Sequence, residues 1–71
     1  MTYTEACEIV YSNKATCAKD FYEARFTLDL MRYVESDKAG FSEGEKAGLI
    51  DEIVSHGAKF VNDQYSLIRG A

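Results

Sequence analysis

The sequence predicts an all-α fold, and three observations support this prediction. It contains no proline, its apolar residues recur every three to four positions, and no stretch alternates between apolar and polar residues over the length of a strand. Capping boxes of the form Ser/Thr-x-x-Glu occur at Thr2 with Glu5 and at Ser42 with Glu45. Because a capping box satisfies free N–H groups at a helix start, each pair indicates where a helix begins.

Three helices are expected within a single domain of 71 residues. The first, over about residues 3–12, should end where Ser12 and Asn13 supply a stop and the next N-cap. The second should cover about residues 14–35, followed by a turn in which Gly40 can adopt a positive φ. The third should cover about residues 43–68. Short loops then predict a short N-terminal helix followed by a long antiparallel helical hairpin.

The third predicted helix contains one internal glycine that weakens the helix prediction. Its main apolar stripe comprises Ile50, Ile53, Val54, Gly57, Val61, Tyr65 and Ile68. Gly57 lowers helix propensity, so it marks either a close contact between helices or a break near Ser55 and His56.

The second predicted helix carries two apolar stripes. At about 100° per residue, one seam contains Cys17, Phe21, Ala24, Leu28 and Met31. A second stripe, nearly opposite, contains Tyr22, Phe26, Leu30 and Tyr33. We expect the third helix to cover the first seam and the short first helix to cover only part of the second stripe. The remaining aromatic strip therefore predicts an interface with another copy, which would complete a helical bundle, or with a protein partner.

Composition and charge exclude several classes of function. The formal net charge is −4, and each half of the chain carries four basic and six acidic residues. The basic patch of a nucleic-acid-binding protein is therefore missing, and binding to nucleic acid is not expected. We also expect no signal peptide and no membrane-spanning segment. Two cysteines are too few for a disulfide scaffold, so the sequence favours a cytoplasmic protein with reduced thiols.

No combination of residues indicates catalysis, a metal site or a cofactor. His56 is the single histidine, and Glu52 four residues earlier is its expected neighbour on the helix surface. Cys7 and Cys17 fall on separate predicted helices, and their spacing matches no zinc motif. We interpret both thiols as small buried apolar residues.

Three basic side chains suggest a possible anion-binding edge. Lys14, Arg25 and Arg32 should project from one side of the second helix, beside the aromatic strip. Arginine next to aromatic rings suits an anionic ligand with a ring, such as a nucleotide. However, Lys14 and Arg32 would lie about 27 Å apart along a helix, so one small ligand cannot contact both. The alternative interpretation is a solvated basic edge beside an interface.

These observations predict a non-enzymatic interaction protein that self-associates. We expect it to act stoichiometrically as a regulator or inhibitor of another macromolecule, a role typical of small helical proteins carried by phages and mobile elements. The alternative is an oligomer that sequesters a small anionic ligand, such as a nucleotide signal.

Overall fold

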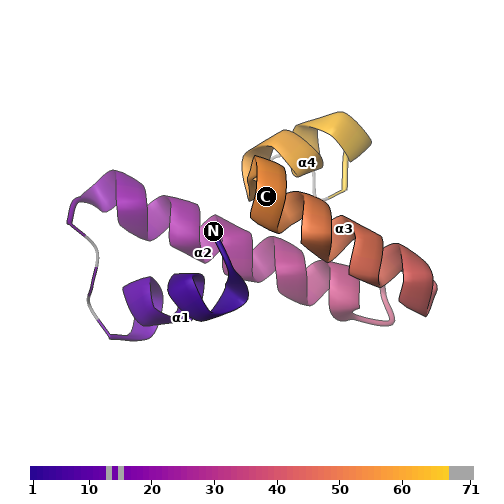
Figure 1. Cartoon of the computed structure of the whole chain (residues 1–71), viewed down its shortest axis with the longest axis horizontal. Coiled ribbons are helices and arrows are strands. Elements are labelled where there is room, and N and C mark those ends of the chain that lie inside the picture. Colours follow the sequence, from indigo (N-terminus) through magenta and orange to yellow (C-terminus); the bar gives the residue numbers. More distant parts are fainter. Residues whose placement is uncertain (13, 15, 68–71) are drawn as a thin grey trace.

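The chain folds into four α-helices, in agreement with the predicted all-α class. The computed structural model describes residues 1–12, 14 and 16–67. The helices are α1 (Tyr3–Tyr11), α2 (Ala18–Glu35), α3 (Glu43–His56) and α4 (Ala58–Tyr65), and the described residues contain no strand. Figure 1 shows α2 as the central element, with α1 packed along its first half and with α3 and α4 beside its second half.

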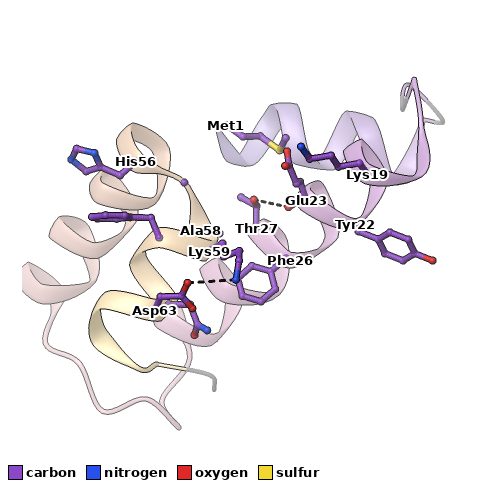
Figure 2. Close-up of a pocket in the computed structure, with 13 residues that line it drawn as sticks. Met1, Lys19, Tyr22, Glu23, Phe26, Thr27, His56, Ala58, Lys59 and Asp63 are labelled. Atoms are coloured by element: carbon purple, nitrogen blue, oxygen red, sulfur yellow. Dashed lines mark hydrogen bonds and ion pairs between the residues drawn. The ribbon is translucent and has the colours of Figure 1, made fainter. Parts of the chain in front are cut away.

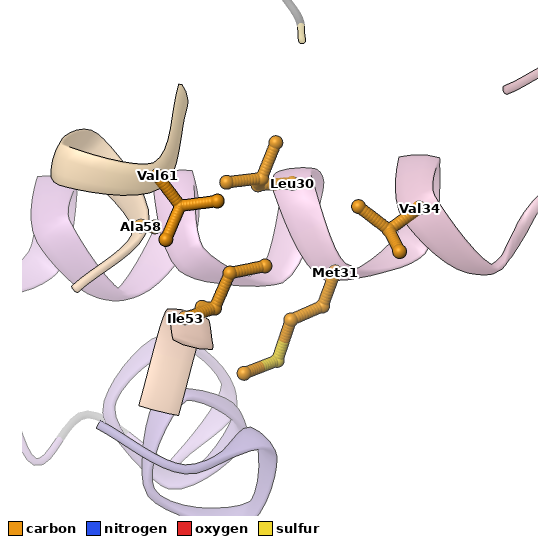
Figure 3. Packing of buried hydrophobic residues seen from close by; sticks show 6 residues of the cluster. All are labelled: Leu30, Met31, Val34, Ile53, Ala58 and Val61. Atoms are coloured by element: carbon orange, nitrogen blue, oxygen red, sulfur yellow. The ribbon is translucent and has the colours of Figure 1, made fainter. Parts of the chain in front are cut away.

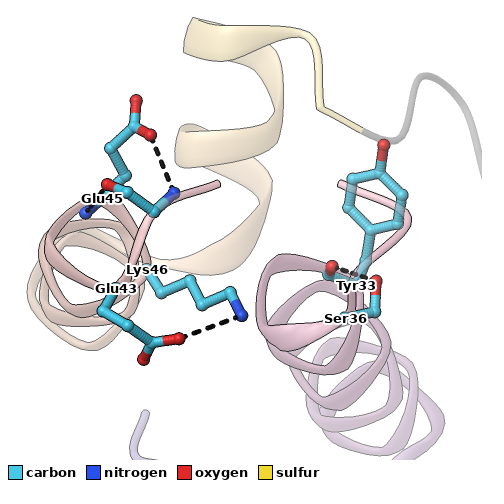
Figure 4. A network of polar contacts seen from close by, with 6 residues as sticks. Tyr33, Ser36, Glu43, Glu45 and Lys46 are labelled. Carbon is cyan, nitrogen blue, oxygen red and sulfur yellow. Dashed lines mark hydrogen bonds and ion pairs between the residues drawn. The ribbon is translucent and has the colours of Figure 1, made fainter. Parts of the chain in front are cut away.

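Both predicted capping boxes are present, and both start helices at the expected residues. The backbone N–H of Glu5 donates to the Thr2 hydroxyl at 3.1 Å, and the Thr2 N–H donates to the Glu5 carboxylate at 3.0 Å. The corresponding distances between Ser42 and Glu45 are 3.3 Å and 2.9 Å (Figure 4). Each box satisfies two N–H groups that a helix start would otherwise leave free.

The second helix begins later than the sequence suggested. It starts at Ala18 rather than at Lys14, with Cys17 as an N-cap in extended conformation. Because Cys17 is extended (φ −159°, ψ 170°), Thr16 lies before the helix, where its backbone N–H donates to the Asp20 side chain at 3.4 Å and its hydroxyl donates to the same carboxylate. The expected N-cap at Asn13 lies outside the described residues.

The third predicted helix is in fact two helices, so the prediction of one helix over residues 43–68 is wrong. Gly57 has φ 99° and ψ 147°, a conformation that a helix interior does not contain. Its N–H donates to the Ile53 carbonyl at 2.9 Å, and its own carbonyl accepts from Val61 at 3.2 Å. Gly57 therefore ends α3 and begins α4. The second arm of the expected hairpin is consequently shorter, and Ile68 lies outside the described residues.

The core consists of two hydrophobic clusters on α2. The larger cluster joins α2 to α3 and α4 and contains Leu30, Met31, Val34, Ile53, Ala58 and Val61 (Figure 3). The smaller joins α2 to α1 and contains Ala6, Ala24 and Leu28. The expected pairing of faces is therefore right for Met31 and wrong for the other core residues: α1 covers Ala24 and Leu28, whereas the C-terminal helices cover Leu30.

A helical projection of α2 gives the reason for this difference. Leu30, Val34, Met31 and Leu28 follow one another around the helix over about 160°. One broad apolar face of this width can be covered by α1 and by the pair α3 and α4 side by side, so these helices do not need to lie on opposite sides of α2.

Among the described residues, none of the helices is long and apolar enough to cross a bilayer.

Candidate interaction cleft

A cleft of about 770 Å³ separates the first half of α2 from α4. It exists because α3 and α4 pack against Leu30, Met31 and Val34 and therefore cover only the second half of α2 on this side. We call the first half, residues 18–26, the α2 overhang. The break at Gly57 turns the chain between α3 and α4 (Figure 1), so that α4 forms the opposite wall of the cleft (Figure 2).

Aromatic side chains line both walls of the cleft. Tyr22 on the overhang is 69% exposed, and Phe60 on α4 is 54% exposed. Phe26 lies deeper and is half-buried. Exposed aromatic rings on two walls of one concave surface are typical of sites that bind other molecules. The lining residues are Met1, Lys19, Tyr22, Glu23, Phe26, Thr27, His56, Gly57, Ala58, Lys59, Phe60, Asn62 and Asp63.

The charges in the cleft are balanced, although the whole chain carries a net charge of −4. Lys19 and Glu23 lie on the overhang, and Lys59 and Asp63 lie on α4. Lys59 and Asp63 form an ion pair at 3.5 Å (Figure 2). By contrast, neither Lys19 nor Glu23 belongs to an ion pair within the part of the chain that the structure describes. Where it lines the cleft, the overhang therefore presents one cationic side chain, Lys19, and one anionic side chain, Glu23, without a charged partner at contact distance.

The structure divides the predicted aromatic strip between surface and core. Tyr22 and Phe26 line the cleft. Leu30 is fully buried against the chain's own α3 and α4, so its expected place on an exposed interface is wrong. Tyr33 is half-buried, and its carbonyl accepts a 2.6 Å hydrogen bond from the Ser36 hydroxyl (Figure 4).

Phe60 and His56 also line this cleft, although the sequence pattern does not place either of them with Tyr22 and Phe26. Their rings lie 5.5 Å apart at an interplanar angle of 42°. The signal available in the sequence was Gly57: a break there moves the following residues off the continuous stripe. The Tyr65 hydroxyl at the end of α4 donates to the carboxylate of Glu52, the expected neighbour of His56, and this hydrogen bond raises the pKa of Tyr65.

The three basic side chains of the predicted anion-binding edge do not converge. Lys14 lies before α2 and pairs with Glu8 at 3.3 Å. Arg25 pairs with Asp29 at 3.4 Å, one turn along the same helix.

Arg32 is the exception among them, because its only polar partners in the described chain are tyrosines. It donates to the Tyr11 hydroxyl at 2.8 Å, and this hydrogen bond, followed by a second one that it donates to Tyr3, raises the pKa of the guanidinium. A small cavity of about 350 Å³ adjoins it, lined by Tyr3, Met31, Arg32, Glu35 and Ile50.

The cysteines differ in their surroundings. Cys7 is half-buried beside the smaller cluster. Cys17 is exposed because it precedes α2 rather than lying within it, so its interpretation as a buried residue is wrong. Among the described residues, no group of three or more His, Cys, Asp or Glu side chains is arranged to hold a metal ion.

Comparison of the chain with family models, with curated proteins and with solved structures gives no match.

Proposed function

We propose that the protein acts stoichiometrically, by binding another macromolecule as its regulator or inhibitor and by associating with itself. The observation that carries this proposal is the open cleft, which is lined by the exposed rings of Tyr22 on α2 and Phe60 on α4. Tyrosine and phenylalanine anchor protein interfaces because each buries a large area at a small cost in side-chain entropy. In an 8.0 kDa chain, such a surface is a large share of the molecule.

We further propose that the protein is not an enzyme, that it is cytoplasmic and that it has no cofactor. The charged groups in the cleft support a binding role rather than a catalytic one. Lys59 and Asp63 are paired with each other along one helix, and His56 lies against the aromatic ring of Phe60. A general base needs a proton donor of the substrate within hydrogen-bond reach, whereas the contacts of these side chains are an ion pair and a ring contact.

Affinity capture with matched variants tests the partner half of the proposal. Phe60→Glu places a charge on the α4 wall, and Gln64→Glu places the same residue on an exposed position of α4 outside the cleft. We expect a protein to be retained at a fixed molar ratio by the wild type and by Gln64→Glu, and to be lost with Phe60→Glu. Equal retention by all three proteins would contradict a role for the cleft.

A second candidate function, sequestration of a small anionic ligand such as a nucleotide, is favoured by one observation. Arg32 carries a cation without a carboxylate at ion-pair distance in the described chain, and Tyr3 and Tyr11 beside it are 46% and 61% exposed. Arginine between aromatic rings suits the phosphate and base of a nucleotide.

Thermal shift with a nucleotide panel distinguishes the two candidates. A ligand that binds only the folded state raises the melting temperature. The ligand-binding candidate requires a rise that Arg32→Gln abolishes and that Arg25→Gln, a change of the same kind on the same helix, preserves. The absence of any rise with the wild type would favour the macromolecular partner.

A further inference from the structure

We infer that the α2 overhang binds a second copy of itself, with the two helices antiparallel about a twofold axis beside Tyr22. This inference rests on the self-association within the proposed function, and it specifies the surface and the contacting residues. In this arrangement, the start of α2 from the second copy occupies the cleft.

The first observation is that one side of the overhang has no helix against it. On the other side, α1 packs on Ala24 and Leu28. Further along α2, the C-terminal helices bury Leu30 and neighbouring residues. Between these contacts, Lys19, Tyr22 and Glu23 are all exposed (Figure 2). The unoccupied surface is therefore about two helical turns long.

The second observation is the charge pattern of this surface. Lys19 and Glu23 are four residues apart and lie on the same side of α2, a spacing that suits an ion pair within one helix. In the described chain they form no such pair with each other or with any other residue. When two copies pair antiparallel about a point midway between these positions, Lys19 of each copy faces Glu23 of the other. The twofold symmetry then forms this ion pair twice.

The third observation is the position of Tyr22. It lies within one residue of the midpoint between Lys19 and Glu23, so the two tyrosine rings meet near the proposed axis. A twofold interface requires a surface that is complementary to itself, and a ring on the axis meets this requirement. At 69% exposure, Tyr22 is also the most exposed large apolar side chain in the described residues.

The same register explains the shape and charge of the cleft. Beyond the axis, Thr16 and Cys17 of the second copy, which immediately precede its α2, come opposite Phe26 and lie toward the α4 wall with Phe60. The cleft thus receives the start of the second helix. Because its own charges are balanced, approach of a second copy there avoids the repulsion that a net charge of −4 otherwise imposes. A foreign partner that uses the cleft has to displace this second copy.

The contact is short, so we expect a dimer that dissociates on dilution. Charge reversal tests it. Lys19→Glu and Glu23→Lys each convert both proposed pairs into like-charge contacts, and each should raise the dimer dissociation constant by about 10-fold or more. A mixture of the two variants restores both pairs, so it should form a heterodimer. Native mass spectrometry with one variant ¹⁵N-labelled identifies this species, and light scattering across a concentration series gives the mass.

The double variant Lys19→Glu/Glu23→Lys keeps opposite charges four residues apart, so it remains informative if a single variant fails to fold. It should dimerise with itself and should not exchange with the wild type. Matched controls are Lys38→Glu and Asp51→Lys, which make the same charge changes at exposed positions outside the cleft and should each dimerise as the wild type does.

Two results would overturn the inference, and they differ in their consequence. A wild type that stays at 8.0 kDa throughout the series removes self-association from the proposed function as well. A wild-type dimer whose single variants remain dimeric, or whose mixture forms no heterodimer, contradicts this register only.

Discussion

Ile53 of α3 and Val61 of α4 have no exposed surface and pack in the same cluster, although Gly57 separates their helices (Figure 3). Both contribute to the cluster that also contains Leu30 of α2. The two short C-terminal helices are therefore held as one layer by a shared apolar contact rather than by a continuous helix.

Val61→Asp should unfold the protein for this reason, and Ile53→Asp should do the same. A charge buried without a partner costs several kcal/mol, which is comparable to the whole stability of about 5 kcal/mol expected for so small a domain. Circular dichroism at 25 °C should show loss of most helical signal. Gln64→Asp, an exposed position on the same helix, should retain it. A Val61→Asp protein that melts at the wild-type temperature would contradict the assigned core.

The two thiols should differ in both reactivity and stability effect. Cys17 is an exposed N-cap in extended conformation, and its side chain makes no capping hydrogen bond. Cys17→Ser supplies a good capping oxygen and should stabilise the protein by about 0.5–1 kcal/mol. Cys7→Ser places a hydroxyl beside the smaller cluster and should destabilise it by about 1 kcal/mol. Urea denaturation of the two variants measures these changes.

Thiol labelling checks the same assignment independently. A thiol reagent should modify Cys17 quickly in the native state and Cys7 slowly. Equal rates, or stoichiometric zinc in the purified protein that is lost in the double serine variant, would contradict the assignment of both residues as ordinary thiols.

Acid should destabilise the protein through its capping carboxylates. The pKa of Glu45 lies below its ordinary value of 4.5, first because its carboxylate accepts the Ser42 backbone N–H and then through the Ser42 side chain. The pKa of Glu5 is lowered in the same way by Thr2.

The direction of the pH dependence follows from these lowered pKa values. A carboxylate whose pKa is lower in the folded state contributes stability above its unfolded pKa, and this contribution is lost as pH falls through the folded pKa. The melting temperature should therefore decline below about pH 4.5. Glu45→Gln cannot titrate, so its decline should be shallower than that of the wild type. An identical pH profile for the two proteins would show that this carboxylate does not contribute.

The sequence predicted the two helix starts that carry capping boxes better than it predicted the other helix starts or the packing of faces. Capping boxes are local, since Ser42 and Glu45 contact only each other's backbone and side chains, so their pattern alone identifies them. The assignment of faces failed because periodicity shows which residues of α2 are apolar and does not show which helix covers them. Leu30 therefore appeared to be an interface residue, whereas the chain buries it.

For a related reason, the sequence predicted only the α2 wall of the cleft. The spacing of Tyr22 and Phe26 predicts that they share one face of a helix. Phe60 joins them only because the chain turns at Gly57, and the sequence left a break there as one of two interpretations. A conformational preference at a single glycine thus decides where the second wall of the cleft lies.

The last prediction concerns that glycine. Gly57 has φ 99°, in a region that residues with a Cβ rarely adopt, although a Cβ built there would meet no atom within 4 Å. Gly57→Ala should therefore be destabilising through backbone strain alone, by about 1–3 kcal/mol. Gly48→Ala provides the matched control, because Gly48 lies within α3, its added Cβ also meets nothing within 4 Å, and alanine favours a helix interior by about 0.5–1 kcal/mol. Thermal denaturation should thus shift the two alanine variants in opposite directions. If Gly57→Ala were as stable as the wild type, the straight third helix that the sequence pattern allowed would be accessible, and the α4 wall of the cleft would lose its structural basis.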